Sequence, residues 1–152
     1  MSAHIATTLY VAKREYQLPE GMTVCEAVHS LFSHYCSPWK TSIAAESEMM
    51  IDNASFVKMC KETPDLRDKI VTNHEFDIIF TKAKPQGARR LNFENFLNAL
   101  LELSIRKFPN EDPSVSFAKL LSYHIFGLFD IQPSIGGSII HEKIRDEILS
   151  SV

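Results

Sequence analysis

Residues 73–108, NHEFDIIFTKAKPQGARRLNFENFLNALLELSIRKF, decide how this chain folds. Apolar side chains recur there every three or four positions, near the start and again from Phe93 onward, which is the period of one helical face. A basic loop that contains Pro85 and Gly87 separates the two sets. The stretch therefore predicts a helix, a loop and a second helix. Their apolar positions are Phe76, Ile79, Phe80 and Ala83, and then Phe93, Phe96, Leu97, Leu100, Leu101, Ile105 and Phe108.

The loop and the start of the second helix resemble the exit of an EF-hand, a helix–loop–helix unit that binds calcium. An EF-hand loop supplies oxygen ligands at positions 1, 3, 5 and 12 and glycine at position 6. With Leu91 at the loop's usual apolar position 8, only two of these places carry a side-chain oxygen, Gln86 and Asn95, and both are neutral. The other places hold Lys84, Ala88 and Arg89.

Positive charge stands where an EF-hand needs carboxylates. The cations of this loop are Lys82, Lys84, Arg89 and Arg90. They would repel a divalent cation. Residues 37–51, the loop of a possible first unit, also lack a run of spaced carboxylates. The sequence thus predicts an all-α fold of EF-hand-like paired helix–loop–helix units without calcium ligands.

Capping residues place the other helices. Thr23 and Glu26 form a capping box for a helix that Ser37-Pro38 ends. Asp52 or Asn53 caps a short helix that Thr63-Pro64 ends.

Later helix boundaries follow the same logic. Thr72 and Glu75 form a second capping box, and the helix after the basic loop runs from Asn92 to Lys107. Ser114 is predicted to cap a further helix, whose apolar side holds Phe117, Leu120, Leu121, His124 and Leu128. There is hardly any strand pattern in the chain.

The sequence predicts a core domain with a separate segment at each end. Residues 1–22 form a predicted N-terminal arm, although alternation from Ile5 to Val11 would also suit a short strand. Residues 23–130 form the core domain. Residues 131–152 form a linker with Pro133 and Gly136-Gly137, then an amphipathic helix over Ile139–Leu149 that folds back or docks on another protein.

Size and composition suit one domain. The chain has 152 residues, of which 45% are hydrophobic. No apolar run approaches the roughly 18 residues of a membrane span, and the first residues lack the apolar segment of a secretory signal. Three cysteines do not make a disulfide framework at this length, which favours a reducing, intracellular setting.

Charge is unevenly distributed along the chain. Residues 56–110 carry ten basic and seven acidic side chains, whereas residues 1–55 and 111–152 each carry three basic and six acidic ones. A basic middle favours an acidic partner, although an ordinary mixed surface would give the same pattern.

Several short motifs follow one another in the middle of the chain. They are SFVKMCK at 55–61, NHEFDIIF at 73–80, KAK at 82–84, ARRLNFENF at 88–96, ALLEL at 99–103 and RKF at 106–108. This order resembles the core domain of the tubulin polymerization-promoting protein family, over about residues 23–128.

The resemblance implies an all-α, EF-hand-like core that does not use calcium. It implies binding to tubulin and microtubules, promotion of their assembly or bundling, and a cytoskeletal location in the cytoplasm. Single-domain relatives in ciliated and flagellated organisms imply a role in the axoneme or basal body of a cilium or flagellum. The chain departs from the family at Asn95, which replaces a carboxylate. Its apolar 139–149 segment stands where vertebrate members have a basic, glycine-rich tail.

The candidate contact surface for tubulin consists of the clustered cations in the middle of the chain. These are Lys58, Lys61, Lys82, Lys84, Arg89, Arg90, Arg106 and Lys107. Because the exterior of tubulin is strongly acidic, such cations could steer and hold it. The alternative is an ordinary solvated face. Nucleic acid is not predicted, because the overall charge is negative and no aromatic pattern interleaves the cations. No membrane partner is predicted either.

Four potential zinc ligands lie within twelve residues, namely Cys25, His29, His34 and Cys36. A second ligand pair of the CxxC type is missing, and cysteines are more often simply buried than bound to a metal. Cys60 is likewise predicted to pack in the core beside Phe56. Residues 135–138, IGGS, lack the ending of a phosphate-binding P-loop. No catalytic residue, metal or cofactor is predicted, and the protein is not predicted to be an enzyme. The alternative function is a calcium-independent adaptor that grips a partner helix in an EF-hand-like groove.

Overall fold

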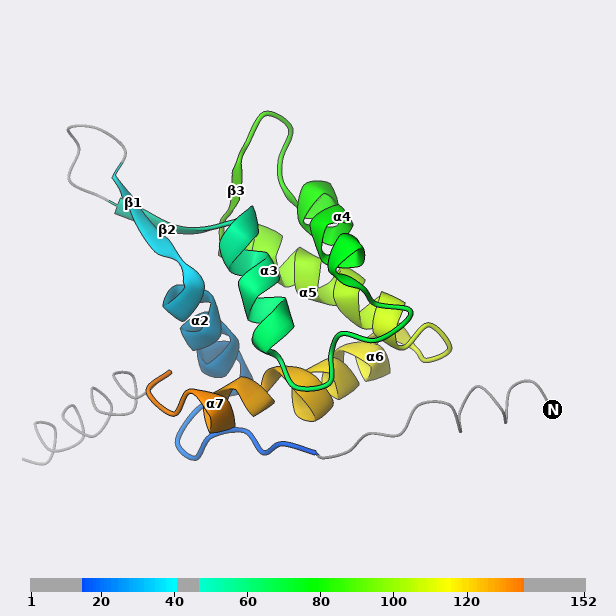
Figure 1. The fold of residues 1–152 in the computed structure, drawn as a ribbon. Coiled ribbons are helices and arrows are strands. Elements are labelled where there is room, and N and C mark those ends of the chain that lie inside the picture. The colour runs from blue at the N-terminus through cyan, green and yellow to red at the C-terminus, as the bar shows by residue number, and fades with distance from the viewer. Residues whose placement is uncertain (1–14, 41–46, 136–152) are drawn as a thin grey trace, which may run out of the picture.

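The computed structural model describes residues 15–40 and 47–135, and helices make up most of this part of the chain (Figure 1). The mostly helical fold agrees with the prediction. The possible strand at Ile5–Val11 and the helix predicted at 139–149 lie outside the described residues. In chain order the elements are α2 (Val24–Tyr35), β1 (Ser37–Lys40), β2 (Ser47–Asp52), α3 (Asn53–Glu62), α4 (Asn73–Ala83), β3 (Arg90–Leu91), α5 (Phe93–Lys107), α6 (Pro113–Leu120), the π-helical turn η1 (Leu121–Ile125) and α7 (Gly127–Ile131).

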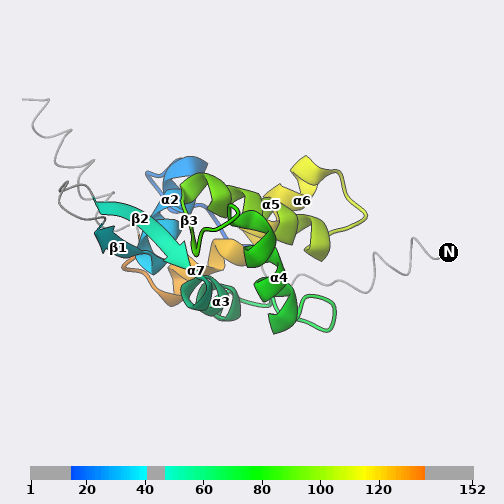
Figure 2. The same cartoon turned by 90° about the horizontal axis from the view of Figure 1, so that it is seen from above.

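A small antiparallel sheet, which the sequence did not predict, ties the two helix–loop–helix segments together. Its strand order is β1-β2-β3, with β2 between the other two (Figure 2). Ile51 pairs with Leu91, and Asp52 pairs with Arg90. Because β3 has only two residues, it is too short to leave an alternating apolar pattern in the sequence.

Most of the predicted helix starts are confirmed. Thr23 and Glu26 form the expected capping box, with backbone-to-side-chain distances of 2.9 and 3.1 Å. Asp52 caps α3 by accepting a hydrogen bond from the Ser55 amide at 2.8 Å. The helix predicted from Asn92 to Lys107 is α5, with Asn92 as its capping residue.

Two predicted caps are wrong. Thr72 makes no side-chain cap at the start of α4. The Glu75 carboxylate pairs with Arg106 of α5 instead of closing a capping box. Asp112 rather than Ser114 caps α6, and Pro113 occupies the first helical position, where its missing amide proton costs nothing.

Phenylalanine rings from four helices meet in the core. Phe96 of α5 lies 5.1 Å from Phe32 of α2 and 6.3 Å from Phe56 of α3, centroid to centroid. Phe56 lies 5.8 Å from Phe80 of α4. Cys60 is fully buried in this core, as predicted. Such ring pairs add about 0.5–1.5 kcal/mol each beyond their buried area, so α5 is the element that joins the others.

The last described helices cover one end of this assembly. α6, η1 and α7 lie beneath α2, α3 and α5 in Figure 1, and α6 makes extensive contact with α5. Leu120, Ile125 and Leu128 are at most 1% exposed. Gln132, which follows α7, donates hydrogen bonds to the Tyr35 hydroxyl and to Glu62 Oε1, both at 3.0 Å. These apolar and polar contacts lock the C-terminal helices onto α2 and α3.

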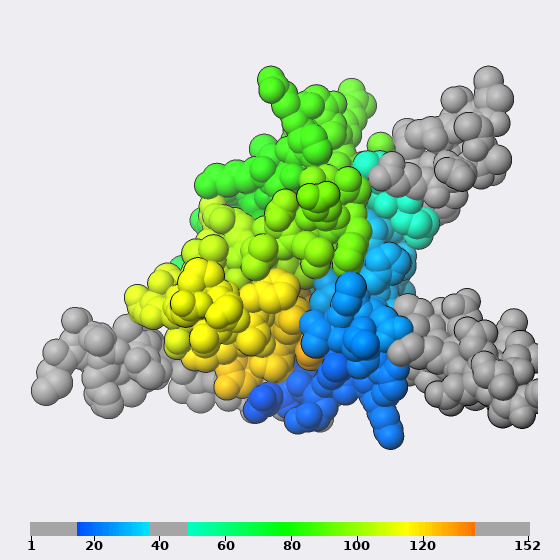
Figure 3. Space-filling model, turned by 180° about the vertical axis from the view of Figure 1, so that it is seen from behind, coloured from blue at the N-terminus to red at the C-terminus, as the bar shows by residue number. Residues whose placement is uncertain are grey.

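The π-helical turn has a structural reason. In η1 the Phe126 amide donates to the Leu121 carbonyl at 2.8 Å, five residues back, instead of to Ser122. The Ser122 carbonyl is therefore released from the helix, and it accepts the Tyr16 amide at 2.6 Å. Residues 15–22, called the strap below, thus lie against the core. They are the described part of the N-terminal arm that the sequence predicts over residues 1–22. Figure 3 shows the strap, in dark blue, beside the yellow-orange residues of α6 and η1.

A buried cation holds the loop between α3 and α4. The Lys107 side chain is 1% exposed, and its Nζ donates to the Asp65 and Leu66 carbonyls at 3.2 and 2.9 Å and to Asp68 Oδ2 at 2.6 Å. His124 Nδ1 donates to the Pro64 carbonyl at 2.8 Å. The loop backbone is therefore bound from α5 and from η1.

Ionisation of this cluster is shifted by its surroundings. Burial lowers the pKa of His124, and the nearby charge of Lys107 lowers it further, against an opposing effect of the Pro64 hydrogen bond. Burial would raise the pKa of Asp68, but hydrogen bonds from Lys107 and from the Val71 and Ile70 amides outweigh it and hold that pKa below its usual value.

Gly127 is predicted to be intolerant of a side chain. A Cβ atom there would lie 2.8 Å from Pro64 Cγ and 2.8 Å from Tyr16 Cε2. Overpacking of this kind costs about 1–3 kcal/mol. We expect Gly127→Ala to lower the urea midpoint accordingly, whereas Thr81→Ala, on the exposed surface of α4, should change stability by less than about 0.5 kcal/mol. Equal midpoints for Gly127→Ala and wild type would show that the strap does not pack against α7.

Protonation of His124 should destabilise the fold. Because its folded-state pKa is lowered, the unfolded chain binds the proton more tightly. Its contribution to stability is complete above the unfolded pKa of about 6.5 and is lost as the pH falls below that value. Urea midpoints measured from pH 8 to pH 5 should fall, and His124→Asn should flatten this slope while the exposed-site control His74→Asn retains it. A slope that survives in His124→Asn would assign the pH dependence to another group.

Candidate partner-binding surface

The loop between α4 and α5 turns sharply and then enters the sheet. α4 ends with Lys84 as its capping residue, and the Ala88 amide donates to the Pro85 carbonyl at 3.0 Å. Gly87 has a φ of 83°, in the left-handed region that glycine adopts without steric cost. β3 then leads directly into α5.

The side chain at the predicted last ligand position is already engaged. Asn95 Oδ1 accepts the Asn92 amide at 3.3 Å, while Asn92 Oδ1 accepts the Asn95 amide at 2.8 Å. Asn95 therefore caps the start of α5 rather than facing an ion. Gln86 is exposed at the turn. Among residues 15–40 and 47–135, no three histidine, cysteine, aspartate or glutamate side chains come together as a metal-binding group.

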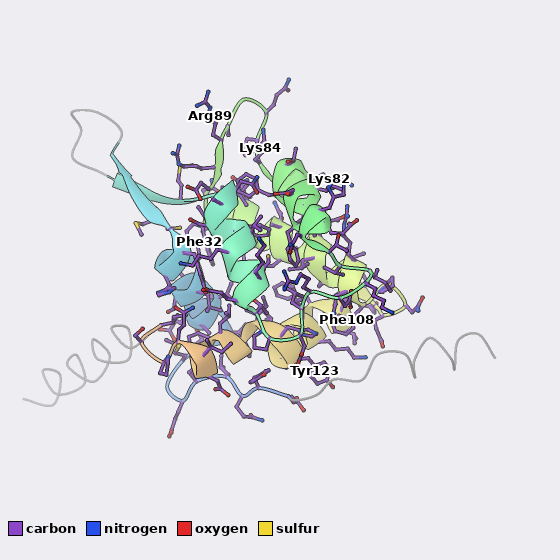
Figure 4. All side chains as sticks on the ribbon, viewed as in Figure 1. Phe32, Lys82, Lys84, Arg89, Phe108 and Tyr123 are labelled. Atoms are coloured by element: carbon purple, nitrogen blue, oxygen red, sulfur yellow. The ribbon has the colours of Figure 1, made fainter. Side chains whose placement is uncertain are left out.

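Three of the predicted contact residues lie in this loop or in the helical turn that leads into it. Lys82, in the last turn of α4, and Arg89 are exposed, while Lys84 is half-buried (Figure 4). Arg90 follows in β3 and is half-buried. The chain has no acidic residue between Asp77 and Glu94, so positive charge dominates the loop locally. We call Lys82, Lys84, Arg89 and Arg90 the cationic tip.

Two further predicted residues lie on α3. Lys58 and Lys61 are both exposed. They line an open groove of about 630 Å³ beside α4. The groove is also lined by Ala54, Val57, Glu62 and Asp77.

Arg106 and Lys107 do not belong to this surface. They end α5, about 21 Å along the helix axis from its start next to the cationic tip. Arg106 is held by Glu75 and by Glu102, the latter at 3.2 Å. Lys107 is buried in the cluster described above. Of the eight predicted contact residues, Lys107 is buried and Arg106 is engaged in ion pairs within the fold. Sequence order alone does not show which way adjacent side chains point.

The cysteine and histidine residues of α2 also lie in separate surroundings. Cys25 is exposed, and His29 packs its ring 4.8 Å from that of Phe93. His34 Nε2 donates to Gln132 Oε1 at 2.7 Å. Cys36 is half-buried, and burial together with the charge of Asp52 raises the pKa of its thiol to about 12. A thiol of this kind stays protonated at neutral pH and is a weak nucleophile.

A polar network that sequence reasoning missed joins α2, α3 and the end of α7. The Tyr35 hydroxyl donates to Glu62 Oε1 at 2.5 Å. Burial raises the pKa of Tyr35, and Glu62 raises it further through the hydrogen bond and its charge. No sequence motif marks these residues, because Tyr35 and Glu62 are 27 positions apart.

The fold and surface define a class of protein, a mainly helical protein of two helix–loop–helix segments whose second loop carries positive charge. No helix within 15–40 and 47–135 has the length and hydropathy needed to cross a bilayer. Comparison with known families then gives the particular one. The p25-alpha family matches residues 29–137, and the chain belongs to this family, that of the tubulin polymerization-promoting proteins.

Individual relatives agree. Tubulin polymerization-promoting protein family member 2 of Mus musculus is 36% identical over 70 residues, which cover 46% of this chain and 41% of the relative. Member 2 of Homo sapiens is 32% identical over 80 residues, covering 53% and 46% respectively. Member 3 of Mus musculus is 33% identical over 67 residues, covering 44% and 38%. The chain spans less than half the length of these curated relatives.

We predict that the loop does not bind calcium. Titration of the protein with millimolar calcium in a calorimeter should give only the heat of dilution, because none of the ligand positions carries a carboxylate, Lys84 occupies the first of them, and Asn95 is held by its cap. Asn95→Asp, which restores one carboxylate, should behave in the same way. A saturable heat with one ion per chain would contradict this reading of the loop.

Proposed function

We propose that this protein is a non-enzymatic, microtubule-associated protein that binds tubulin and stabilises or organises microtubules. The relatives that it matches are named for promoting tubulin polymerization. The strongest support within the chain is the cationic tip, which projects from the body and carries exposed Lys82 and Arg89. Oriented positive charge of this kind accelerates and strengthens association with an acidic surface.

The proposal includes an EF-hand-like origin of the scaffold. The two loops end alike: a fully buried aliphatic residue, Ile51 or Leu91, is followed by a capping residue, Asp52 or Asn92, and then by a helix. The two aliphatic residues pair with each other across the sheet. This equivalence supports two related units, of which the second has exchanged ion ligands for cations.

The proposed location is the cytoskeleton, with a cilium or flagellum axoneme as the specific setting. Imaging of a tagged copy in its own cell tests this point. Signal along axonemes or basal bodies supports the setting, and signal confined to cytoplasmic microtubules would limit the role to the cell body.

The alternative function, an adaptor with an open groove for a partner helix, receives less support. The apolar side chains of α6, η1 and α7 already cover the end of the helix assembly, and Leu121 is 5% exposed. A partner helix would have to displace this segment together with its hydrogen bonds from Gln132 and His124.

Co-sedimentation with polymerised tubulin tests the proposal. Wild type should pellet with microtubules, and pelleting should weaken as salt is raised. Lys82→Glu/Arg89→Glu should weaken binding roughly tenfold, since each exposed charge contact contributes about 0.5–1 kcal/mol and reversal adds repulsion. Arg90 is left unchanged because it belongs to the sheet.

The matched control is Arg67→Glu/Lys69→Glu, two exposed cations in the α3–α4 loop, which changes the net charge by the same amount. If both double variants lose microtubule binding equally, the effect comes from the net charge of the protein rather than from the cationic tip. Wild-type protein that stays in the supernatant at low salt and micromolar concentration would refute tubulin binding by this chain.

A further inference from the structure

The groove between α3 and α4 is built from an outward face of α3. Ala54 precedes Val57 and Lys58 by three and four residues, and Lys61 follows them by four and three, so these residues form one stripe of the helix. The opposite stripe, with Phe56, Met59 and Cys60, is fully buried. α3 and α4 lie next to each other in both views, which leaves the outward stripe as one wall and floor of the groove (Figures 1 and 2).

The groove combines apolar contact with charges of both signs, because two lysines, Lys58 and Lys61, and two carboxylates, Glu62 and Asp77, line it. Val57 is half-buried, and the methylene stems of the two lysines extend the apolar floor. Among the described residues, neither Lys58 nor Lys61 has a carboxylate within ion-pair distance. Glu62 is already bonded to Tyr35. Asp77 of α4 therefore supplies the opposing charge on the far side of the groove.

One end of the groove meets the cationic tip. α3 begins directly after Asp52, which pairs with Arg90 across the sheet. The start of α3 therefore lies next to Arg90 of the cationic tip. From Ala54 to Lys61 the helix rises about 10 Å, a length that about three residues of extended chain would span.

We propose that this groove binds an extended acidic peptide segment. Carboxylates of the segment pair with Lys58 and Lys61, and an aliphatic side chain between them lies on Val57. The inference rests on the proposed function, since it names the kind of tubulin element that the protein recognises: a flexible acidic tail rather than a folded face alone.

Fluorescence anisotropy of a labelled eight-residue peptide, in which glutamate alternates with valine, tests the groove directly. The full chain should bind it, and the matching glutamine–valine peptide should bind at least tenfold more weakly. Lys58→Gln/Lys61→Gln should weaken binding of the glutamate peptide about tenfold, and Asp77→Asn should strengthen it a few-fold. The control Arg67→Gln/Lys69→Gln should leave it unchanged.

The two double variants remove the same charge from exposed positions, and thermal melts establish that each remains folded. Equal weakening by both would assign binding to overall charge and overturn the proposal, as would equal affinity for the two peptides. The Asp77→Asn variant is an independent test, because it should raise the affinity for the glutamate peptide. An unchanged or weaker affinity of this variant also overturns the proposal.

Microtubules whose acidic tails have been removed by limited proteolysis separate this inference from the proposed function. Wild type should bind the digested microtubules less well than intact ones. On digested microtubules the variant Lys58→Gln/Lys61→Gln should bind nearly as well as wild type, because removal of the tails and removal of the two lysine charges abolish the same contact. If wild type pellets equally with both, tubulin binding stands and the groove assignment fails. If it pellets with neither, tubulin binding itself fails, whatever the peptide result.

Discussion

The pairing of Ile51 with Leu91 is the contact on which the rest of the structure depends. Both side chains are fully buried, and each directly precedes the capping residue of a helix. The pairing therefore fixes where α3 and α5 begin relative to each other. From that point Phe56 and Phe96 enter the same core, and α2 and α4 pack against them through further rings. A few residues of strand thus set the geometry of a mostly helical fold, because they anchor two helices at the same end.

Lysine and arginine serve two opposite purposes in this chain. Lys82 and Arg89 of the cationic tip and the two lysines of the groove on α3 are exposed, where charge acts on other molecules and costs little desolvation. At the end of α5 lysine and arginine act within the fold: Arg106 links α5 to Glu75 of α4, and Lys107 replaces its hydration with two carbonyls and a carboxylate. A buried ammonium is tolerable only when its protons are satisfied in this way. The same residue types therefore form the proposed contact surface at one end of α5 and a structural clasp at the other.

Sequence reasoning predicted the helices because their apolar period is long and regular, and it predicted most caps because capping is local. It missed the sheet, because β3 has only two residues and the sequence SEMMID of β2 does not alternate apolar and polar side chains. It also missed the π-helical turn, which goes with a hydrogen bond between Tyr16 of the strap and Ser122, more than 100 positions away. The exposed tip was predictable from Lys82 to Arg90, since loop residues with proline and glycine rarely enter a core. The burial of Lys107 was not, because it depends on the loop at Asp65–Asp68, some 40 positions away. The groove likewise depends on α4 lying against α3, which no local pattern specifies.

The enclosure of Lys107 gives the molecule a built-in reporter. An amine-reactive reagent meets the exposed lysines of the native state at once, but it reaches this amine only when the segment over it lifts away. The rate of acylation of Lys107 therefore reports how often residues 63–72 open. The free energy of such an opening can range from that of a loop fluctuation to that of global unfolding. Mass spectrometry of the single peptide that carries Lys107 would follow these openings without any engineered probe.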